Sequence, residues 1–103
     1  MTEDVQMDQV FEKAAELFSV LSTPTRLRII SALCGGEKSV GQLLEAIDVA
    51  QSNMSQHLNI MYRCGVVGKR RQGAQVFYRI ADGSAVMLCR AGCTQVAIDA
   101  APQ

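Results

Sequence analysis

The sequence predicts a mainly α fold with one β-hairpin, in the order α-α-α-α-β-β-α, built as a single domain over residues 1–103. The length of 103 residues allows one modest hydrophobic core. In five segments, apolar residues recur every three or four positions, as they do along one face of a helix. Between residues 66 and 80 this spacing gives way to two short runs rich in Val, Phe and Tyr, which is typical of strands.

The first two helices are separated by a capping sequence. Residues 7–21 have the spacing of an amphipathic helix, with the apolar positions Val10, Phe11, Ala14, Leu17, Phe18 and Leu21. Thr23 then offers a capping hydroxyl, and Pro24 suits the first position of a new helix. The second helix should run to Leu33, because Gly35 and Gly36 follow it.

Residues 39–64 predict a helix-turn-helix. Ser39 and Gln42 fit a capping box that opens a short third helix. A connection at residues 48–50 leads to a fourth helix over 51–64, whose inward side is formed by Met54, Leu58 and Met61. A short helix, a tight turn and a second helix with a polar outer face are typical of DNA-reading modules.

The extended segment and the last helix complete the chain. The runs 66–67 and 76–80 predict a hairpin over 66–80, with residues 68–73 as its turn. This places the basic residues Lys69, Arg70 and Arg71 at the tip. Residues 84–100 return to helical spacing, so a final helix is expected there.

Composition excludes several classes of protein. Apolar residues make up 49% of the chain, too many for a disordered segment, and no apolar run is long enough to span a membrane. The acidic start does not resemble a secretion signal, so we expect a cytoplasmic protein. His57 is the one histidine, and no Gly-rich phosphate loop or carboxylate pair stands beside a nucleophile, so no enzyme is expected.

The fourth helix has a face suited to the major groove. With its apolar side turned inward, the outer side carries side chains that can donate to and accept from base edges or reach phosphate. These are Ser52, Gln56, Asn59 and Arg63, flanked by Asn53 and Ser55. His57 lies at the edge of the core, where it could be a hydrogen-bonded boundary residue or a DNA contact.

Charge is segregated along the chain although its net value is zero. Residues 1–22 hold five acidic residues and Lys13, a net charge of −4. Residues 49–81 hold five basic residues and no acid, a net charge of +5. A basic hairpin beside a polar helix can grip phosphates, so double-stranded DNA is the expected partner.

Four segments together resemble the arsenic-repressor (ArsR/SmtB) family. They are residues 21–29 (LSTPTRLRI), 39–43 (SVGQL), 51–58 (QSNMSQHL) and 71–80 (RQGAQVFYRI). The resemblance covers about residues 8–95.

The resemblance implies a winged helix-turn-helix repressor that forms a homodimer through its first and last helices. Such a repressor leaves its operator when an inducer binds. The resemblance also implies DNA contacts from Gln51, Ser52, Asn53, Ser55, Gln56 and His57, and from the wing residues Lys69, Arg70, Arg71 and Gln72.

The inducer site departs from the patterns of this family. Members that sense arsenic through the third helix carry Cys-x-Cys there, whereas this chain has Val40-Gly41-Gln42. Zinc-sensing members use Asp and His ligands in the last helix, of which Asp82 matches one. Members that sense reactive sulfur pair a cysteine of the second helix with one of the last, and Cys34 and Cys93 each lie about one turn from those positions.

The positions of the four cysteines in the predicted helices indicate which thiols could bind an inducer. Cys34 and Cys64 end helices, where the dipole disfavours a thiolate, so we expect them to be small apolar fillers. Cys89 and Cys93 lie one turn apart and could share zinc, cadmium or trivalent arsenic, accept a persulfide or polysulfide, or simply pack in a dimer interface. A protein-interaction module that never binds DNA and a thiol-redox or metal-buffering protein remain alternatives.

Overall fold

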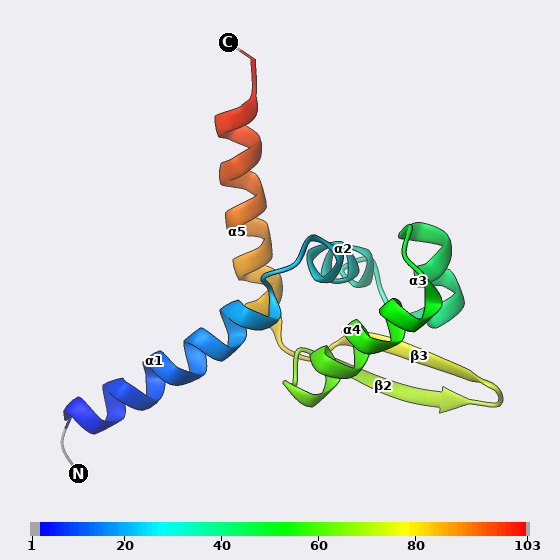
Figure 1. The fold of residues 1–103 in the computed structure, drawn as a ribbon, viewed down its shortest axis with the longest axis horizontal. Coiled ribbons are helices and arrows are strands. Elements are labelled where there is room, and N and C mark those ends of the chain that lie inside the picture. The colour runs from blue at the N-terminus through cyan, green and yellow to red at the C-terminus, as the bar shows by residue number, and fades with distance from the viewer. Residues whose placement is uncertain (1–2, 103) are drawn as a thin grey trace.

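The computed structural model describes residues 3–102 and contains five helices and three strands within that range. The order is α1 (Glu3–Val20), α2 (Pro24–Leu33), β1 (Lys38–Ser39), α3 (Val40–Ala46), α4 (Gln51–Arg63), β2 (Val67–Gln72), β3 (Gln75–Ile80) and α5 (Gly83–Ala100). The predicted α-α-α-α-β-β-α order is confirmed, with β1 added (Figure 1). Helix α1 begins before the predicted residue 7, and α5 begins one residue before the predicted position 84.

Local hydrogen bonds explain where the central helices begin. The Thr23 hydroxyl accepts from the backbone N–H of Arg26 at 3.2 Å, with Pro24 at the first helical position. At α3, the Ser39 hydroxyl accepts from the Gln42 N–H at 3.1 Å, and the Gln42 side chain accepts from the Ser39 N–H at 2.8 Å. Both start signals predicted from the sequence are therefore formed.

The sheet is antiparallel, in the order β1-β3-β2. Strand β1 was not predicted, because its two residues are too few to show a periodicity, and its pairing with Phe77 and Tyr78 is a tertiary contact. The predicted turn over 68–73 is wrong. Strand β2 continues through Gln72, and the chain reverses at Gly73, whose φ of +62° suits glycine.

The basic residues of the hairpin therefore lie on strand β2 and not at its tip. Lys69, Arg70 and Arg71 each pair with a residue of β3, in register with Tyr78, Phe77 and Val76 respectively. A charged run can be part of a strand here because the far half of β2 is exposed, so its side chains remain in water.

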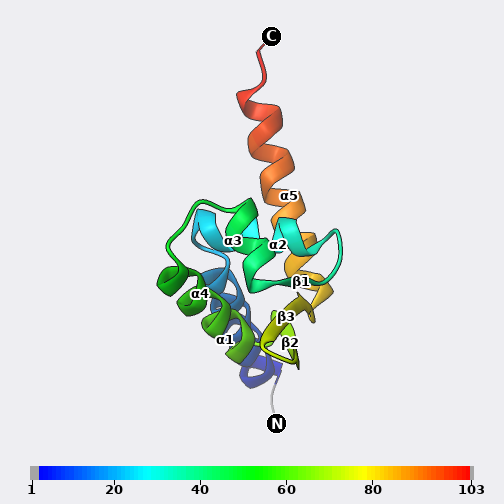
Figure 2. The same ribbon diagram turned by 90° about the vertical axis from the view of Figure 1, so that its right-hand side faces the viewer.

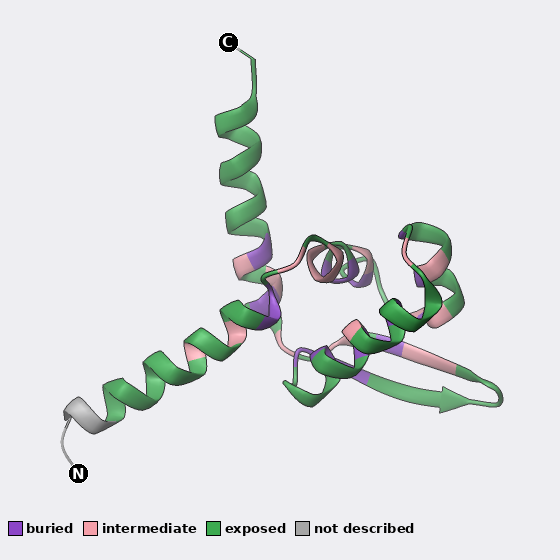
Figure 3. Ribbon diagram, viewed as in Figure 1, coloured by how far each residue is buried: buried purple, intermediate pink, exposed green. Residues whose placement is uncertain are grey.

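The core lies between α2, α3, α4, the base of the hairpin and the first turns of α5. The fully buried large side chains are Ile29, Ile30, Leu43, Met54, Leu58, Met61, Val66 and Val67. Figure 3 shows that burial on α1 and α5 is confined to the ends nearest this core. The core therefore fixes the position of α4 and the hairpin, while most of the two terminal helices contributes little to it.

Helices α1 and α5 project from the core in different directions (Figures 1 and 2). The radius of gyration is 15.6 Å, larger than the roughly 13 Å of a compact domain of about 100 residues. Apolar side chains on both helices are exposed, among them Phe11 and Phe18 on α1 and Met87, Val96 and Ile98 on α5. In the described part of the chain, none of the helices has the length and hydropathy needed to cross a bilayer.

Candidate DNA interface and thiol pocket

Helix α4 presents a polar face opposite the core. Its apolar residues Met54, Leu58 and Met61 are buried, as predicted. The predicted DNA-reading residues Gln51, Ser52, Asn53, Ser55, Gln56, Asn59 and Arg63 are all exposed. Ala50 occupies the N-cap and supplies no side-chain hydrogen bond, so the N–H groups of the first turn stay open.

His57 differs from the other polar residues of α4. It is half-buried, and its Nδ1 accepts a hydrogen bond of 3.0 Å from Nε of Arg26 on α2. Burial, and then the positive charge of Arg26, lowers the pKa of His57. Arg26 also donates to the backbone oxygen of Val20 at the end of α1, at 3.3 Å. Through Arg26, His57 thus joins α4 to the α1–α2 junction as a boundary residue.

The wing carries its basic residues on two different faces. In an antiparallel pair, cross-strand partners share a face, so Lys69 and Arg71 lie on the side of Tyr78 and Val76, which faces the core. The Lys69 ammonium lies 4.4 Å from the ring centre of Tyr62, a residue of α4. Lys69 and Arg71 therefore share the α4 side of the hairpin.

Arg70 lies on the opposite face and is held by Glu37 from the loop before β1. Its Nε donates to the two carboxylate oxygens at 3.0 and 2.9 Å, and its Nη2 donates to Oε1 at 2.6 Å. Its Nη1 donates to the Gln72 side chain at 2.7 Å, and the guanidinium lies 4.6 Å from the ring centre of Phe77. The hydrogen bond from Arg70 lowers the pKa of Glu37.

Sequence reasoning missed Arg26 and Glu37. Arg26 stands in the segment that carries the family resemblance, so its position gave a signal of importance but not of its partner. Glu37 gave no signal, because its ion pair joins residues 33 positions apart and depends on the sheet register.

Cys89 and Cys93 come together on α5. Their sulfur atoms are 4.0 Å apart, and Cys89 Sγ lies 4.0 Å from the backbone oxygen of Leu27 on α2. Cys89 is buried and Cys93 is exposed. Burial, followed by the hydrogen bond with Cys93, raises the pKa of the Cys89 thiol.

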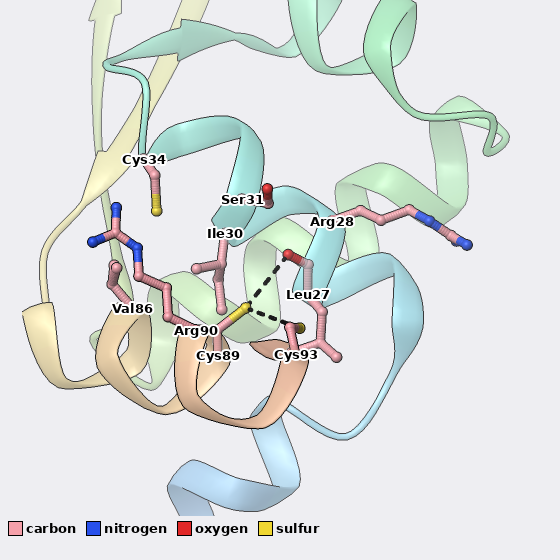
Figure 4. A pocket seen from close by; sticks show the side chains of 9 residues that line it. All are labelled: Leu27, Arg28, Ile30, Ser31, Cys34, Val86, Cys89, Arg90 and Cys93. Atoms are coloured by element: carbon pink, nitrogen blue, oxygen red, sulfur yellow. Dashed lines mark hydrogen bonds between the residues drawn. The ribbon is translucent and has the colours of Figure 1, made fainter. Parts of the chain in front are cut away.

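A pocket of about 390 Å³ between α2 and α5 contains a third thiol (Figure 4). Cys34 enters it from the end of α2 and Arg90 lines it from α5, whereas the Arg28 side chain points away. The prediction that Cys34 and Cys64 are apolar fillers is wrong, because both are exposed. Each follows the last residue of its helix, where the chain has already left the core.

The other candidate ligand has a structural partner. Asp82 caps α5, accepting from the backbone N–H and the hydroxyl of Ser84 at 2.9 and 2.6 Å, and these hydrogen bonds lower its pKa. Among the side chains that the structure describes, no three His, Cys, Asp or Glu residues gather as a metal-binding group. Cys89 and Cys93 are the pair of thiols that the structure brings within 4.0 Å of each other.

An apolar groove runs along α5 next to α1 and α2. It is lined by Phe18, Leu21, Leu27, Leu88, Cys89, Gly92, Cys93, Val96, Ala97 and Ala100. Cys89 and Cys93 border both this groove and the thiol pocket. The two features share a wall on α5.

Comparisons with known proteins agree with this architecture. Residues 23–69 match the model of the "Bacterial regulatory protein, arsR family". A biofilm growth-associated repressor from Xylella fastidiosa is 37% identical over 93 residues, which are 86% of this chain and 82% of that protein. The crystal structure of the transcriptional repressor BigR from Xylella fastidiosa superposes with a TM-score of 0.79 at 33% identity over the full length of both chains.

A solution structure described as a homodimeric winged helix-turn-helix DNA-binding domain, Mb0332 from Mycobacterium bovis, has a TM-score of 0.76 at 25% identity, covering 96% of this chain and 88% of that one. Helix α4, the hairpin beside it and the similarity to these proteins all support the same family assignment. The chain belongs to the arsR family of bacterial regulatory proteins and is a winged helix-turn-helix transcriptional regulator, not an enzyme.

Proposed function

We propose that this chain is a homodimeric, sequence-specific repressor of transcription that leaves its operator when an inducer reacts with its cysteine thiols. The observation that carries the DNA-binding part is the exposed polar face of α4 beside a basic strand. Several of the similar proteins are described as repressors, which supports the direction of regulation.

The recognition helix would supply base contacts and the wing would supply phosphate contacts. Gln56 and Asn59 offer paired donors and acceptors to base edges, and Arg63 reaches guanine or phosphate. Lys69 and Arg71, on the α4 side of the hairpin, add sequence-independent affinity for the backbone. Substituting Gln56 by Ala should therefore reduce the preference for the operator more than the affinity for random DNA.

A second copy of the chain is the occupant that we propose for the apolar groove. The groove is continuous along α5 and next to α1, and Val96 and Phe18 within it are 67% and 56% exposed. Exposed apolar surface of this extent on two projecting helices is typical of a protein interface. In such a dimer the two α4 helices would enter successive major grooves of a palindromic site, about 34–36 Å apart.

The shared wall on α5 suggests how an inducer would act. Cys89 and Cys93 border both the thiol pocket and the groove proposed for dimerisation. Adding atoms to either sulfur changes the shape of that interface and favours a different arrangement of the two α4 helices. Induction is then a shift between two dimer arrangements, of which one matches the spacing of the operator.

Two thiol chemistries are consistent with the pocket. A thiol can take the sulfane sulfur from a low-molecular-weight persulfide, giving a protein persulfide and releasing the donor as its thiol. A soft ion such as zinc, cadmium or trivalent arsenic would find two thiolates here. Zinc usually takes four ligands, and in a dimer the second copy would offer the same two thiols again.

Titration of a duplex from the region upstream of its own gene, against a random duplex of equal length, tests the proposal. We expect preference for the upstream duplex, release after treatment with a persulfide donor, arsenite, zinc or cadmium, and loss of release in Cys89→Ser and Cys93→Ser. Mass spectrometry of the released protein would show either added sulfur or bound metal. Equal affinity for both duplexes would refute the repressor, and thiol reactivity without any DNA binding would support a redox or buffering protein instead.

A further inference from the structure

Arg70 is the most heavily engaged of the basic residues on the wing. Its three guanidinium nitrogens donate to Glu37 or Gln72 at 2.6–3.0 Å, and its planar group lies over Phe77. Such bidentate pairing uses the same donors with which an arginine grips a phosphate. While the pair with Glu37 persists, Arg70 has few donors left for DNA.

The register separates Arg70 from its two basic neighbours. Lys69 and Arg71 lie on the face of Tyr78 and Val76, toward α4, whereas Arg70 lies on the face of Phe77. The Glu37 carboxylate stands on the Phe77 face as well, because it holds Arg70 there. A phosphate approaching that face meets a negative group as well as a positive one.

We propose that Glu37 withholds Arg70 from DNA, so that each wing offers Lys69 and Arg71 to phosphates and Glu37 limits the sequence-independent affinity of the wing. This inference rests on the proposed DNA-binding function. A phosphate contact strengthens binding to every sequence equally, so an additional free arginine on the wing would raise affinity for random DNA as much as for the operator. Withholding Arg70 therefore lowers the affinity for every duplex by the same factor and leaves the preference for the operator to the contacts of α4.

Exposed ion pairs are individually weak, so the competition with phosphate must be measured. In this case three features act together, since the carboxylate pairs at two points, Gln72 holds the third nitrogen, and Phe77 supports the guanidinium plane. The carboxylate is also tethered beside Arg70 in every molecule, whereas a phosphate must be brought to it.

The dependence of affinity on salt measures directly how many phosphates the protein neutralises. The slope of log K against log salt concentration changes by about 0.9 for each additional phosphate that is neutralised on B-form DNA. We would measure this slope on a random-sequence duplex for the wild type, Glu37→Gln, Glu37→Gln with Arg70→Gln, and Arg71→Gln. Far-UV circular dichroism and thermal unfolding would show that each variant is folded.

Releasing Arg70 should make the slope of Glu37→Gln steeper by about 0.9 per wing, whereas the double variant should have the wild-type slope. Arg71→Gln is the matched control from the opposite face of the same strand, and its slope should be shallower by about 0.9 per wing. The inference is overturned if the double variant loses as much slope as Arg71→Gln, because Arg70 would then be a DNA contact. A wild-type protein with no salt-dependent binding to any duplex would instead overturn the proposed function, and the inference with it.

Discussion

Val96 is the residue at which the proposed dimer can be tested most directly. It lines the apolar groove and is 67% exposed in the single chain. Val96→Ala removes two methyl groups, each worth about 0.8 kcal/mol on transfer from water. Since about two-thirds of the side chain would be newly buried, the loss is about 1 kcal/mol per copy. The residue occurs twice in a two-fold interface, giving about 2 kcal/mol, or about 30-fold weaker association.

Sedimentation equilibrium or mass photometry over a dilution series would measure this change. Ile98→Ala is the matched control, because Ile98 is 62% exposed on the same helix but does not line the groove. Alanine favours helix more than either residue, so a weaker dimer cannot be attributed to a less stable α5. Equal dissociation constants for Val96→Ala and the wild type, or equal losses in both variants, would refute this assignment of the groove.

Three further predictions concern the recognition helix and the thiols. Ala50→Ser should raise the free energy of unfolding by about 1 kcal/mol in urea denaturation, because it adds the missing N-cap of α4; an unchanged or lower value would contradict this. Because the pKa of His57 is lowered in the folded chain, the unfolded chain takes up the proton first as pH falls. The contribution of His57 to the free energy of unfolding is therefore fully present above about pH 6.5 and is lost as the pH falls below that value. In a series of melting temperatures measured against pH, His57→Gln should remove this decline. Iodoacetamide should label the exposed Cys34 before Cys89, which is buried and has a raised pKa; peptide mapping that found the reverse order would refute the described pocket.

The order of the helices and the inward face of α4 could be predicted because they depend on sequence patterns within a few residues. Met54, Leu58 and Met61 recur at the helical period, and the caps at Thr23 and Ser39 depend on residues within three positions. Each of these signals is local in the sequence, so none of these predictions required knowledge of the tertiary fold. The exposed residues of α4 followed from the same geometry.

The features that sequence reasoning missed depend on contacts between distant segments. The bond between Arg26 and His57 joins residues 31 positions apart, and β1 exists only because β3 pairs with it. The turn of the hairpin was misplaced because basic residues, though typical of loops, can also occupy an exposed strand. Cys34 was expected to pack because the C-terminal end of a helix disfavours a thiolate, but at the C-cap of α2 its side chain is exposed.

The charge of the DNA-facing surface also depends on the fold and not on a stretch of sequence. Residues 49–81 contain five basic residues and no acid, which suggests an uninterrupted positive surface. In the structure Glu37, from outside that stretch, contributes its charge to one face of the wing and pairs with Arg70 there. The face toward α4 keeps Lys69 and Arg71, so the positive charge is concentrated on the side that carries the polar residues of the recognition helix. A phosphate backbone that follows this gradient would be drawn to the side of the wing beside α4.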